Sequence, residues 1–136
     1  MAYGFYHRKK GSKYGNKKVE CDGYTFDSTK EMKRYCELKL LQRAGAISDL
    51  ELQKEFELIP NQYKQEERYG KNGKRLKDKQ VLLERKCVYV CDFAYTDAET
   101  GKQVVEDCKS PITKTPVYKV KKKLMLYRYG IVVEEI

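Results

Sequence analysis

Three ionisable residues interrupt two apolar runs in the stretch KCVYVCDFAYTDAETGKQVVEDCKS, residues 86–110. Asp92 stands in the first run, and Asp107 and Lys109 stand in the second. The spacing of an acidic residue, any residue and a lysine occurs four times in the chain, so the spacing alone is a weak signal. The copy at Asp107 and Lys109 differs because it lies in an expected strand, where residues two apart share a face.

The register of the two strands decides whether these side chains meet. If Asp92 lies opposite Asp107 in an antiparallel pair, both carboxylates and Lys109 share one face. If Asp92 lies opposite Glu106 instead, Lys109 falls on the other face. The length of the turn DAETGK does not decide between the two registers. We expect the first.

Two carboxylates held close together repel each other, so one takes up a proton or a cation binds between them. Oxygen ligands without histidine or thiolate suit Mg²⁺ or Mn²⁺. Such a cation activates water and offsets negative charge on a phosphate, and Lys109 can orient the water or contact the phosphate oxygens. The three residues therefore predict metal-dependent phosphodiester hydrolysis. The alternative is that they lie on the solvent-exposed face of a half-buried sheet.

Length and composition limit the class of protein. The 136 residues suit one domain, and 29 Lys+Arg against 20 Asp+Glu give a net charge of +9, which favours a nucleic-acid partner. The single histidine, His7, argues against a histidine-based catalytic triad. No apolar run approaches a membrane span or a signal-peptide core. We therefore expect a cytoplasmic protein with no membrane partner and no small-molecule substrate.

The cysteines favour a reducing compartment. None of them is spaced as C-x-x-C, so buried free thiols are a better interpretation than a zinc site, which is the alternative. The five are Cys21, Cys36, Cys87, Cys91 and Cys108.

The chain divides into a flexible basic N-terminal arm over residues 1–20 and a single domain over residues 21–136. Within the domain we expect a short strand or hairpin turning at Asp22-Gly23, and a mobile, charged loop over residues 61–80. Further strands are expected at residues 54–60, 84–96, 103–109 and 131–136.

Two helices are expected, each with a cap at both ends. The first spans residues 27–47, with Ser28 as N-cap and Gly45 after its last turn. The second begins at Thr115-Pro116 and stops at Gly130. Their expected apolar stripes are Met32, Cys36 and Leu40 beside Tyr35 and Leu38 in the first, and Val117, Val120, Leu124 and Tyr127 in the second.

The resulting order α-β-β-β-α-β, with CDFAY on one strand and VVEDCK on the next, resembles the PD-(D/E)XK nuclease superfamily. The segments KYGNKKVECDGYTFDSTKE, LELQKEFELIP, YVCDFAY and VVEDCKS look like those of a family of small phage-encoded proteins placed in that superfamily. The resemblance implies an α/β (α+β) domain, with a mixed central sheet flanked by helices in a restriction-endonuclease-like αβββαβ core. It also implies Asp92 and Asp107 as metal ligands of a Mg²⁺-dependent endonuclease, with Lys109 and Glu31 in the site. The proline of the superfamily's name is absent, since Cys91 precedes Asp92.

Glu31 has two interpretations. Ser28-x-x-Glu31 forms a capping box, in which the Glu31 carboxylate would accept from the Ser28 backbone N–H. The resemblance implies instead that Glu31 is a site carboxylate. Glu106 points to the face opposite Asp107 in a regular strand, so we expect it to face solvent or a helix and not to bind metal.

Basic residues at two places can follow a phosphate backbone. They are Lys9, Lys10, Lys13, Lys17 and Lys18 in the N-terminal arm, and Lys119, Lys122 and Lys123 on the second helix. The resemblance adds branched DNA or a Holliday junction as substrate and a homodimer as the assembly. The alternatives are a non-catalytic module similar to double-stranded-RNA-binding domains, which also run α-β-β-β-α, and a phage structural protein.

Overall fold

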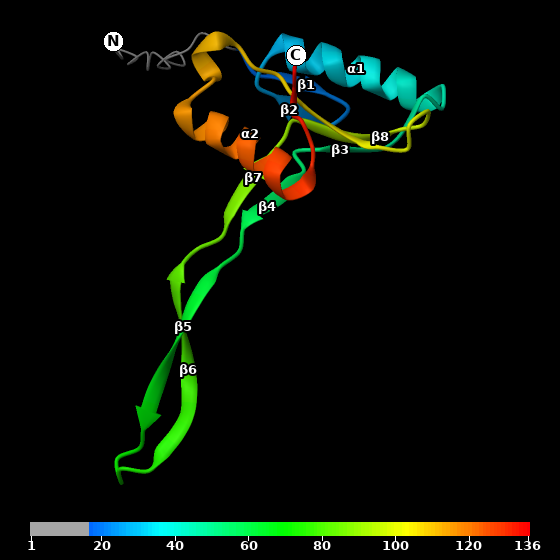
Figure 1. Ribbon diagram of the computed structural model, residues 1–136. Helices are drawn as coiled ribbons and strands as arrows, with labels where there is room; N and C mark the ends of the chain where they lie inside the picture. Colours follow the sequence, from blue (N-terminus) through cyan, green and yellow to red (C-terminus); the bar gives the residue numbers. More distant parts are fainter. Residues whose placement is uncertain (1–16) are drawn as a thin grey trace, which may run out of the picture.

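The computed structural model describes residues 17–136 (Figure 1). Lys9, Lys10 and Lys13 of the expected N-terminal arm therefore lie outside the described residues. Lys17 and Lys18 are exposed, and the first strand begins directly after them, inside the range expected for the arm.

The described residues form two α-helices, one short 3-10 helix and ten β-strands, so the protein is α+β. In chain order they are β1 Val19–Cys21, β2 Tyr24–Phe26, α1 Thr29–Arg43, β3 Ile47–Leu52, β4 Glu55–Ile59, β5 Gln62–Tyr69, β6 Arg75–Glu84, β7 Cys87–Val90, β8 Phe93–Asp97, β9 Gln103–Asp107, η1 Pro111–Thr113, α2 Pro116–Tyr129 and β10 Glu134–Glu135.

A four-stranded mixed sheet forms the centre, in the order β10-β9-β8-β3. The β3–β8 and β8–β9 pairs are antiparallel, and β10 lies parallel to β9. Side chains alternate between the two faces. Phe93 and Tyr95 of β8 pack with residues of α1, whereas Ala94 and Val105 pack with residues of α2. One helix therefore covers each face, as expected.

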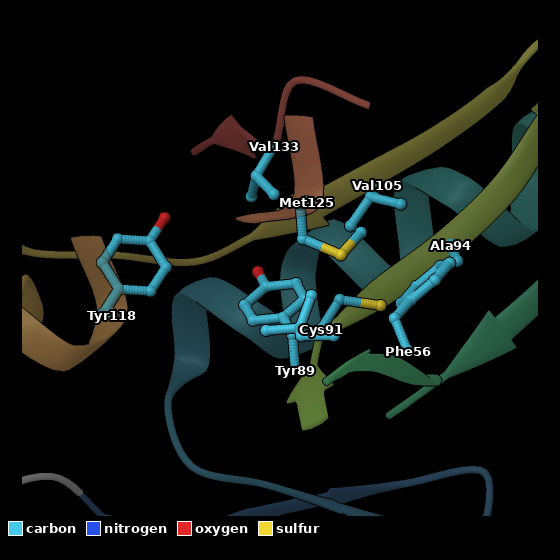
Figure 2. Packing of buried hydrophobic residues seen from close by; sticks show 9 residues of the cluster. Phe56, Tyr89, Cys91, Ala94, Val105, Tyr118, Met125 and Val133 are labelled. Atoms are coloured by element: carbon cyan, nitrogen blue, oxygen red, sulfur yellow. The ribbon is translucent and has the colours of Figure 1, made fainter. Parts of the chain in front are cut away.

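The core on the α2 side extends from the sheet into the neck formed by β4 and β7. Figure 2 shows Phe56, Tyr89 and Cys91 gathered beside Met125 of α2 and Val105 of β9. All five side chains are buried. This cluster fixes the position of β7, and so of the chain that enters the candidate site.

Both predicted helix caps are confirmed. The Ser28 hydroxyl accepts from the backbone N–H of Glu31, and the Thr115 hydroxyl accepts from that of Tyr118. Gly45 and Gly130 both have positive φ after the last turn of their helices, where glycine is favoured. The sequence therefore located both helix ends correctly.

The predicted apolar stripe is wrong for α2 and right only in part for α1, where Tyr35, Leu38 and Met32 pack in the core. Tyr35 and Leu38 are the buried apolar residues of α1, while Cys36 and Leu40 are exposed. In α2, Tyr118 and Met125 are buried. Val117, Val120 and Tyr127 are exposed, and Leu124 is partly buried. Each helix carries two adjacent apolar stripes, and helical spacing alone cannot tell which one faces the sheet.

The loop predicted over residues 61–80 is also wrong, because this segment belongs to two long paired strands, β5 and β6. We call residues 62–84 the projecting hairpin, which extends far from both helices (Figure 1). None of its residues is buried. A strand without a buried face does not need alternating apolar and polar residues, and that alternation is the pattern that identifies a strand in a sequence.

The projecting hairpin is the outer end of one long, bent β-ribbon. Successive antiparallel pairs β3–β8, β4–β7 and β5–β6 run from the central sheet to the turn at Gly70–Lys74. The strand predicted over residues 84–96 is therefore divided into the end of β6, β7 and β8. At the bend nearest the core, Gln53 donates its backbone N–H to the carbonyl of Asp92, and Cys91 donates to that of Lys54.

All five cysteines are free thiols. Cys91 is buried as expected, and Cys21, Cys87 and Cys108 are partly buried, but Cys36 is exposed, which corrects the prediction for that residue. Within residues 17–136, neither helix is long and apolar enough to span a lipid bilayer.

Candidate active site

The strand register is the one that brings the acidic residues together. Phe93 pairs with Glu106 and Ala94 with Val105. Extended by one residue, this register places Asp92 opposite Asp107, at the open end of the β8–β9 pair. The expected register is confirmed.

Asp107 is the most enclosed member of the site, with about 1% of its surface exposed. Its Oδ2 accepts a hydrogen bond from the Tyr89 hydroxyl, and its Oδ1 lies 3.6 Å from the Lys109 Nζ. Burial, and then the neighbouring Asp92 carboxylate, raise the pKa of Asp107 to about 7, although the Tyr89 hydroxyl and the Lys109 ammonium act in the opposite direction. At neutral pH this carboxyl is therefore divided between its acid and its carboxylate.

Asp92 sits at the bend between β7 and β8, so both of its carboxylate oxygens can accept from neighbouring backbone or side chains. Its Oδ2 accepts from the backbone N–H of Cys108 at 2.8 Å, and its Oδ1 accepts from the Gln53 Nε2 at 3.4 Å. The first bond ties the Asp92 carboxylate to the backbone of Cys108, which is the residue between Asp107 and Lys109.

Lys109 is held between an acid and an aromatic ring. Its Nζ lies 4.7 Å from the ring centroid of Tyr118, a favourable cation–π distance. The Tyr118 hydroxyl is buried and has no hydrogen-bond partner within the described part of the chain. Tyr118 therefore contributes its ring to the site, while the hydroxyl is not satisfied there.

Glu31 reaches the same region from the first turn of α1. It is only about 7% exposed, and its Oε2 accepts from the backbone N–H of Asp27 at 3.3 Å. The capping box is thus shifted, because the carboxylate binds the residue before the Ser28 cap. Burial, and then the charge of Asp92, raise the pKa of Glu31 to about 7. Glu31 therefore both ties down the helix start and faces the acidic pair.

Glu106 occupies the opposite face, as expected, and there it faces helix α1. Its carboxylate receives two hydrogen bonds from the Arg34 guanidinium, at 2.9 and 2.5 Å, and one from the Tyr95 hydroxyl at 2.6 Å. Such a paired, fully hydrogen-bonded carboxylate serves structure. Adjacent acids in β9 thus have different roles.

An open groove runs from Asp107 and Lys109 along α2, with a volume of about 300 Å³. We call it the site groove; it is lined by Val88, Tyr89, Val90, Asp107, Lys109, Thr115, Val117, Tyr118 and Lys121. Asp107 and Lys109 therefore border an open space on the surface.

The three α2 lysines predicted to bind nucleic acid lie around a separate hollow, next to Tyr118. Lys119 and Lys123 are exposed. Lys122 forms a salt bridge with Glu135, and so does Lys114, at 2.9 Å. Glu135 thereby offsets much of the charge of Lys122, which weakens that residue as a phosphate contact.

The donor set fits a hard divalent cation only in part. Within residues 17–136, no three His, Cys, Asp or Glu side chains are grouped closely enough to form a complete protein ligand set. Mg²⁺, however, is commonly held by one or two carboxylates, with water and substrate oxygens as its remaining ligands. Asp92 and Asp107, two carboxylates placed opposite each other at the end of the β8–β9 pair, meet that smaller requirement.

Sequence reasoning missed Tyr89 and Tyr118. In a regular strand, Tyr89 would point to the face opposite Asp92, because the two are an odd number of residues apart. The bend at Cys91 and Asp92 cancels this alternation and brings the Tyr89 hydroxyl to Asp107. The contact between Tyr89 and Asp107 could be predicted only from this bend, and no residue pattern in the stretch indicates a bend.

The chain belongs to the protein family described as "Protein of unknown function (DUF1064)", whose pattern matches residues 11–135. No curated protein and no solved structure matches the chain significantly.

Proposed function

We propose that this protein is a Mg²⁺- or Mn²⁺-dependent endodeoxyribonuclease with a restriction-endonuclease-like αβββαβ core. The observation that carries the proposal is the pair Asp92 and Asp107, placed opposite each other with Lys109 beside them. The resemblance of the segments around these three residues to PD-(D/E)XK nucleases also supports it.

Each site residue has a chemical role in this proposal. Asp92 and Asp107 would hold the cation, which, when bound, supplies positive charge that acidifies a water and offsets charge on the phosphate. Lys109, fixed by the Tyr118 ring, contacts the phosphate oxygens or orients the attacking water. Hydrolysis joins the water oxygen to phosphorus, breaks one P–O ester bond and leaves a proton on the departing oxygen.

Glu31 suits the proton transfer. A general base works best when its pKa lies close to the working pH, and burial next to Asp92 raises the pKa of Glu31 to about 7. Glu31 can therefore take the proton that the attacking water loses.

The proposed substrate is DNA with a branch, such as a Holliday junction. The groove is open, and the exposed Lys119 and Lys123 lie near it on α2. No further domain for reading a base sequence lies within residues 17–136, so binding by shape and phosphate contacts is favoured.

The direct test is incubation of the purified protein with plasmid, single-stranded and four-way-branched DNA in Mg²⁺, Mn²⁺ or EDTA. We expect cleavage in both metals and none in EDTA, with the branched substrate cut fastest. Binding of any of these nucleic acids without cleavage in either metal would contradict the proposal, and would favour the non-catalytic binding module.

Replacing Glu31 with glutamine separates its two interpretations. Glutamine can still accept from the Asp27 N–H, so the melting temperature well below pH 4.5, where Glu31 is neutral in both the folded and the unfolded chain, should not change. It cannot take up a proton, so nicking should slow by on the order of a hundredfold. Both quantities are measured on the same preparation.

The matched control is Ser28→Ala, which removes the hydroxyl that caps α1. It should lower stability by about 1 kcal/mol while leaving nicking unchanged well below the melting temperature. If Glu31→Gln nicks at the parental rate, Glu31 serves only the helix start.

A further inference from the structure

The outer part of the projecting hairpin carries a large share of the protein's positive charge. Residues 64–79 contain seven basic and three acidic side chains, so this short segment holds a net charge of +4, against +9 for the whole chain. All ten of these charged side chains are exposed. Positive charge concentrated on one projecting element is the electrostatic pattern of a surface that meets a polyanion.

Most of the basic side chains in this segment are not paired with acids. The Lys64 Nζ lies 2.9 Å from a Glu66 oxygen, and the Arg75 guanidinium lies 3.7 and 3.4 Å from Glu67 and Asp78. These pairs use all three acidic side chains of the segment. Five basic side chains form no salt bridge within residues 17–136, and their charge is available to a partner. They are Arg68, Lys71, Lys74, Lys77 and Lys79.

Basic side chains lie on both faces of the two-stranded ribbon. Glu66 pairs with Lys79 across the strands, and Tyr69 pairs with Arg75. Glu66 and Tyr69 are three residues apart in β5, so these two cross-strand pairs lie on opposite faces. Arg68 is two residues from Glu66 and therefore shares the face of Lys79. A partner on either side of the ribbon meets positive charge.

The tip of the hairpin is narrow, and backbone hydrogen bonds fix its shape. The Gly73 N–H donates to the Gly70 carbonyl at 3.0 Å, and the Gly70 N–H donates to the Lys74 carbonyl at 2.8 Å. Gly73 has a φ of 76°, a left-handed conformation that favours glycine. This turn holds Lys71 and Lys74 at the end of the ribbon, far from both helices (Figure 1).

These features fit the major groove of double-stranded DNA. That groove is about 12 Å wide and admits a two-stranded β-ribbon. Phosphates border the groove on both sides, so a ribbon within it needs basic side chains on both faces. The major groove of duplex RNA is deep and narrow, and a single strand is held mainly by stacking on aromatic rings. Residues 64–79 contain one aromatic side chain, Tyr69, so they suit a single strand poorly.

We propose that the projecting hairpin binds in the major groove of double-stranded DNA and contacts the phosphates on both sides. An isolated two-stranded hairpin is at best marginally stable in water, and the duplex supplies the surface that this one lacks. The eight residues of β5 reach about 26 Å at about 3.3 Å per residue, so the contact lies outside the acidic site.

This proposal shares its partner with the proposed nuclease function, but it does not depend on the cleavage reaction. The hairpin contact needs no metal, because basic side chains alone make it. Binding of DNA can therefore be measured in EDTA, where a metal-dependent nuclease cannot cut.

Fluorescence anisotropy of a labelled DNA duplex in EDTA, over a series of salt concentrations, tests the proposal. The variant Lys71→Gln, Lys74→Gln, Lys77→Gln removes three of the unpaired charges from exposed positions, where the fold should not change. We expect its affinity to fall by about thirtyfold at low salt. The slope of the logarithm of the affinity against that of the salt concentration should become less steep by about 2 to 3, since each phosphate contact contributes about 0.9.

The matched control is the variant Lys33→Gln, Arg43→Gln, Lys102→Gln. It removes the same charge from exposed side chains outside the hairpin that form no salt bridge within residues 17–136. Its affinity and its salt dependence should stay close to those of the parent protein. The comparison separates a contact made by the hairpin from a general effect of net charge.

A second variant removes the outer hairpin. Residues 66–79 are replaced by a Gly-Asn-Gly turn, which joins the cross-strand partners Gln65 and Gln80. It should lose at least as much affinity as the triple hairpin variant, while its far-ultraviolet circular dichroism keeps the helical signal of the parent.

Four results would overturn the proposal: no binding of the duplex by the parent protein in EDTA, equal losses in the hairpin and control variants, parental affinity in the shortened variant, and binding of single-stranded DNA or duplex RNA as tight as that of duplex DNA. The first would leave the hairpin for a protein partner. If the hairpin variants lose affinity but the parent cuts no DNA in Mg²⁺ or Mn²⁺, the nuclease proposal fails and this one stands. If the parent cuts DNA but the hairpin variants bind it normally, the reverse holds.

Discussion

Asp107→Asn is expected to slow metal-dependent DNA cleavage by on the order of a thousandfold or more, and Asp92→Asn should do the same. Each change removes one of the two carboxylates that would hold the cation. DNA affinity, measured by gel shift in Ca²⁺, should be equal to that of the parent or slightly higher, because a negative charge facing the phosphate is lost.

Two further variants make this result specific. Lys109→Ala should also lose most activity but still bind the metal, because its ammonium acts on the water or the phosphate. Glu99→Gln, at an exposed acid in the β8–β9 turn, should cut like the parent protein. Should Asp107→Asn cut at the parental rate, the protein is not a nuclease of this type.

The melting temperature of the metal-free protein is expected to fall as the pH rises from about 4.5 to 7, and to level off above. The folded state raises the pKa values of Asp107 and Glu31 to about 7, from 3.8 and 4.5. Between these pKa values the folded protein keeps protons that the unfolded chain has already released. The free energy of unfolding therefore falls as the pH rises through this range. The combined effect is on the order of several kcal/mol.

Millimolar Mg²⁺ or Mn²⁺ at pH 8 should restore several degrees of this loss, because a cation that binds only the folded state stabilises it. Asp107→Asn serves as the control. It should melt at a higher temperature than the parent at pH 8 without metal, and it should not respond to Mg²⁺. A parent protein whose melting temperature ignores both pH and metal would contradict the arrangement of charges described here.

Local rules predicted the parts of this fold that depend on neighbouring residues. Ser28, Thr115 and Gly130 act through backbone groups within one helical turn, and all three end a helix where expected. The register of β8 on β9 was predicted correctly, but by assuming that the acidic residues share a face, because the turn length does not decide between the two registers.

The rest depends on contacts between distant parts of the chain. Tyr118 and Val117 are equally plausible core residues in the sequence, and only the position of the sheet makes Tyr118 the buried one. The hairpin strands carry no buried face, so their composition resembled a loop. Tyr89 reaches Asp107 through the bend at Cys91 and Asp92, where the backbone is hydrogen-bonded to Gln53 and Lys54, about 40 residues away in the chain.

One ribbon of successive strand pairs joins the hairpin to the site, with short breaks at residues 85–86 and 91–92. β6 continues into β7, β7 ends at Val90, and Asp92 follows two residues later, tied to the opposite strand by the Gln53 N–H. The paired strands β4 and β7 lie between the hairpin and the site, and Phe56 and Tyr89 anchor them in the core. The hairpin and the backbone that carries a site carboxylate therefore belong to the same ribbon, with the α2 core cluster between them.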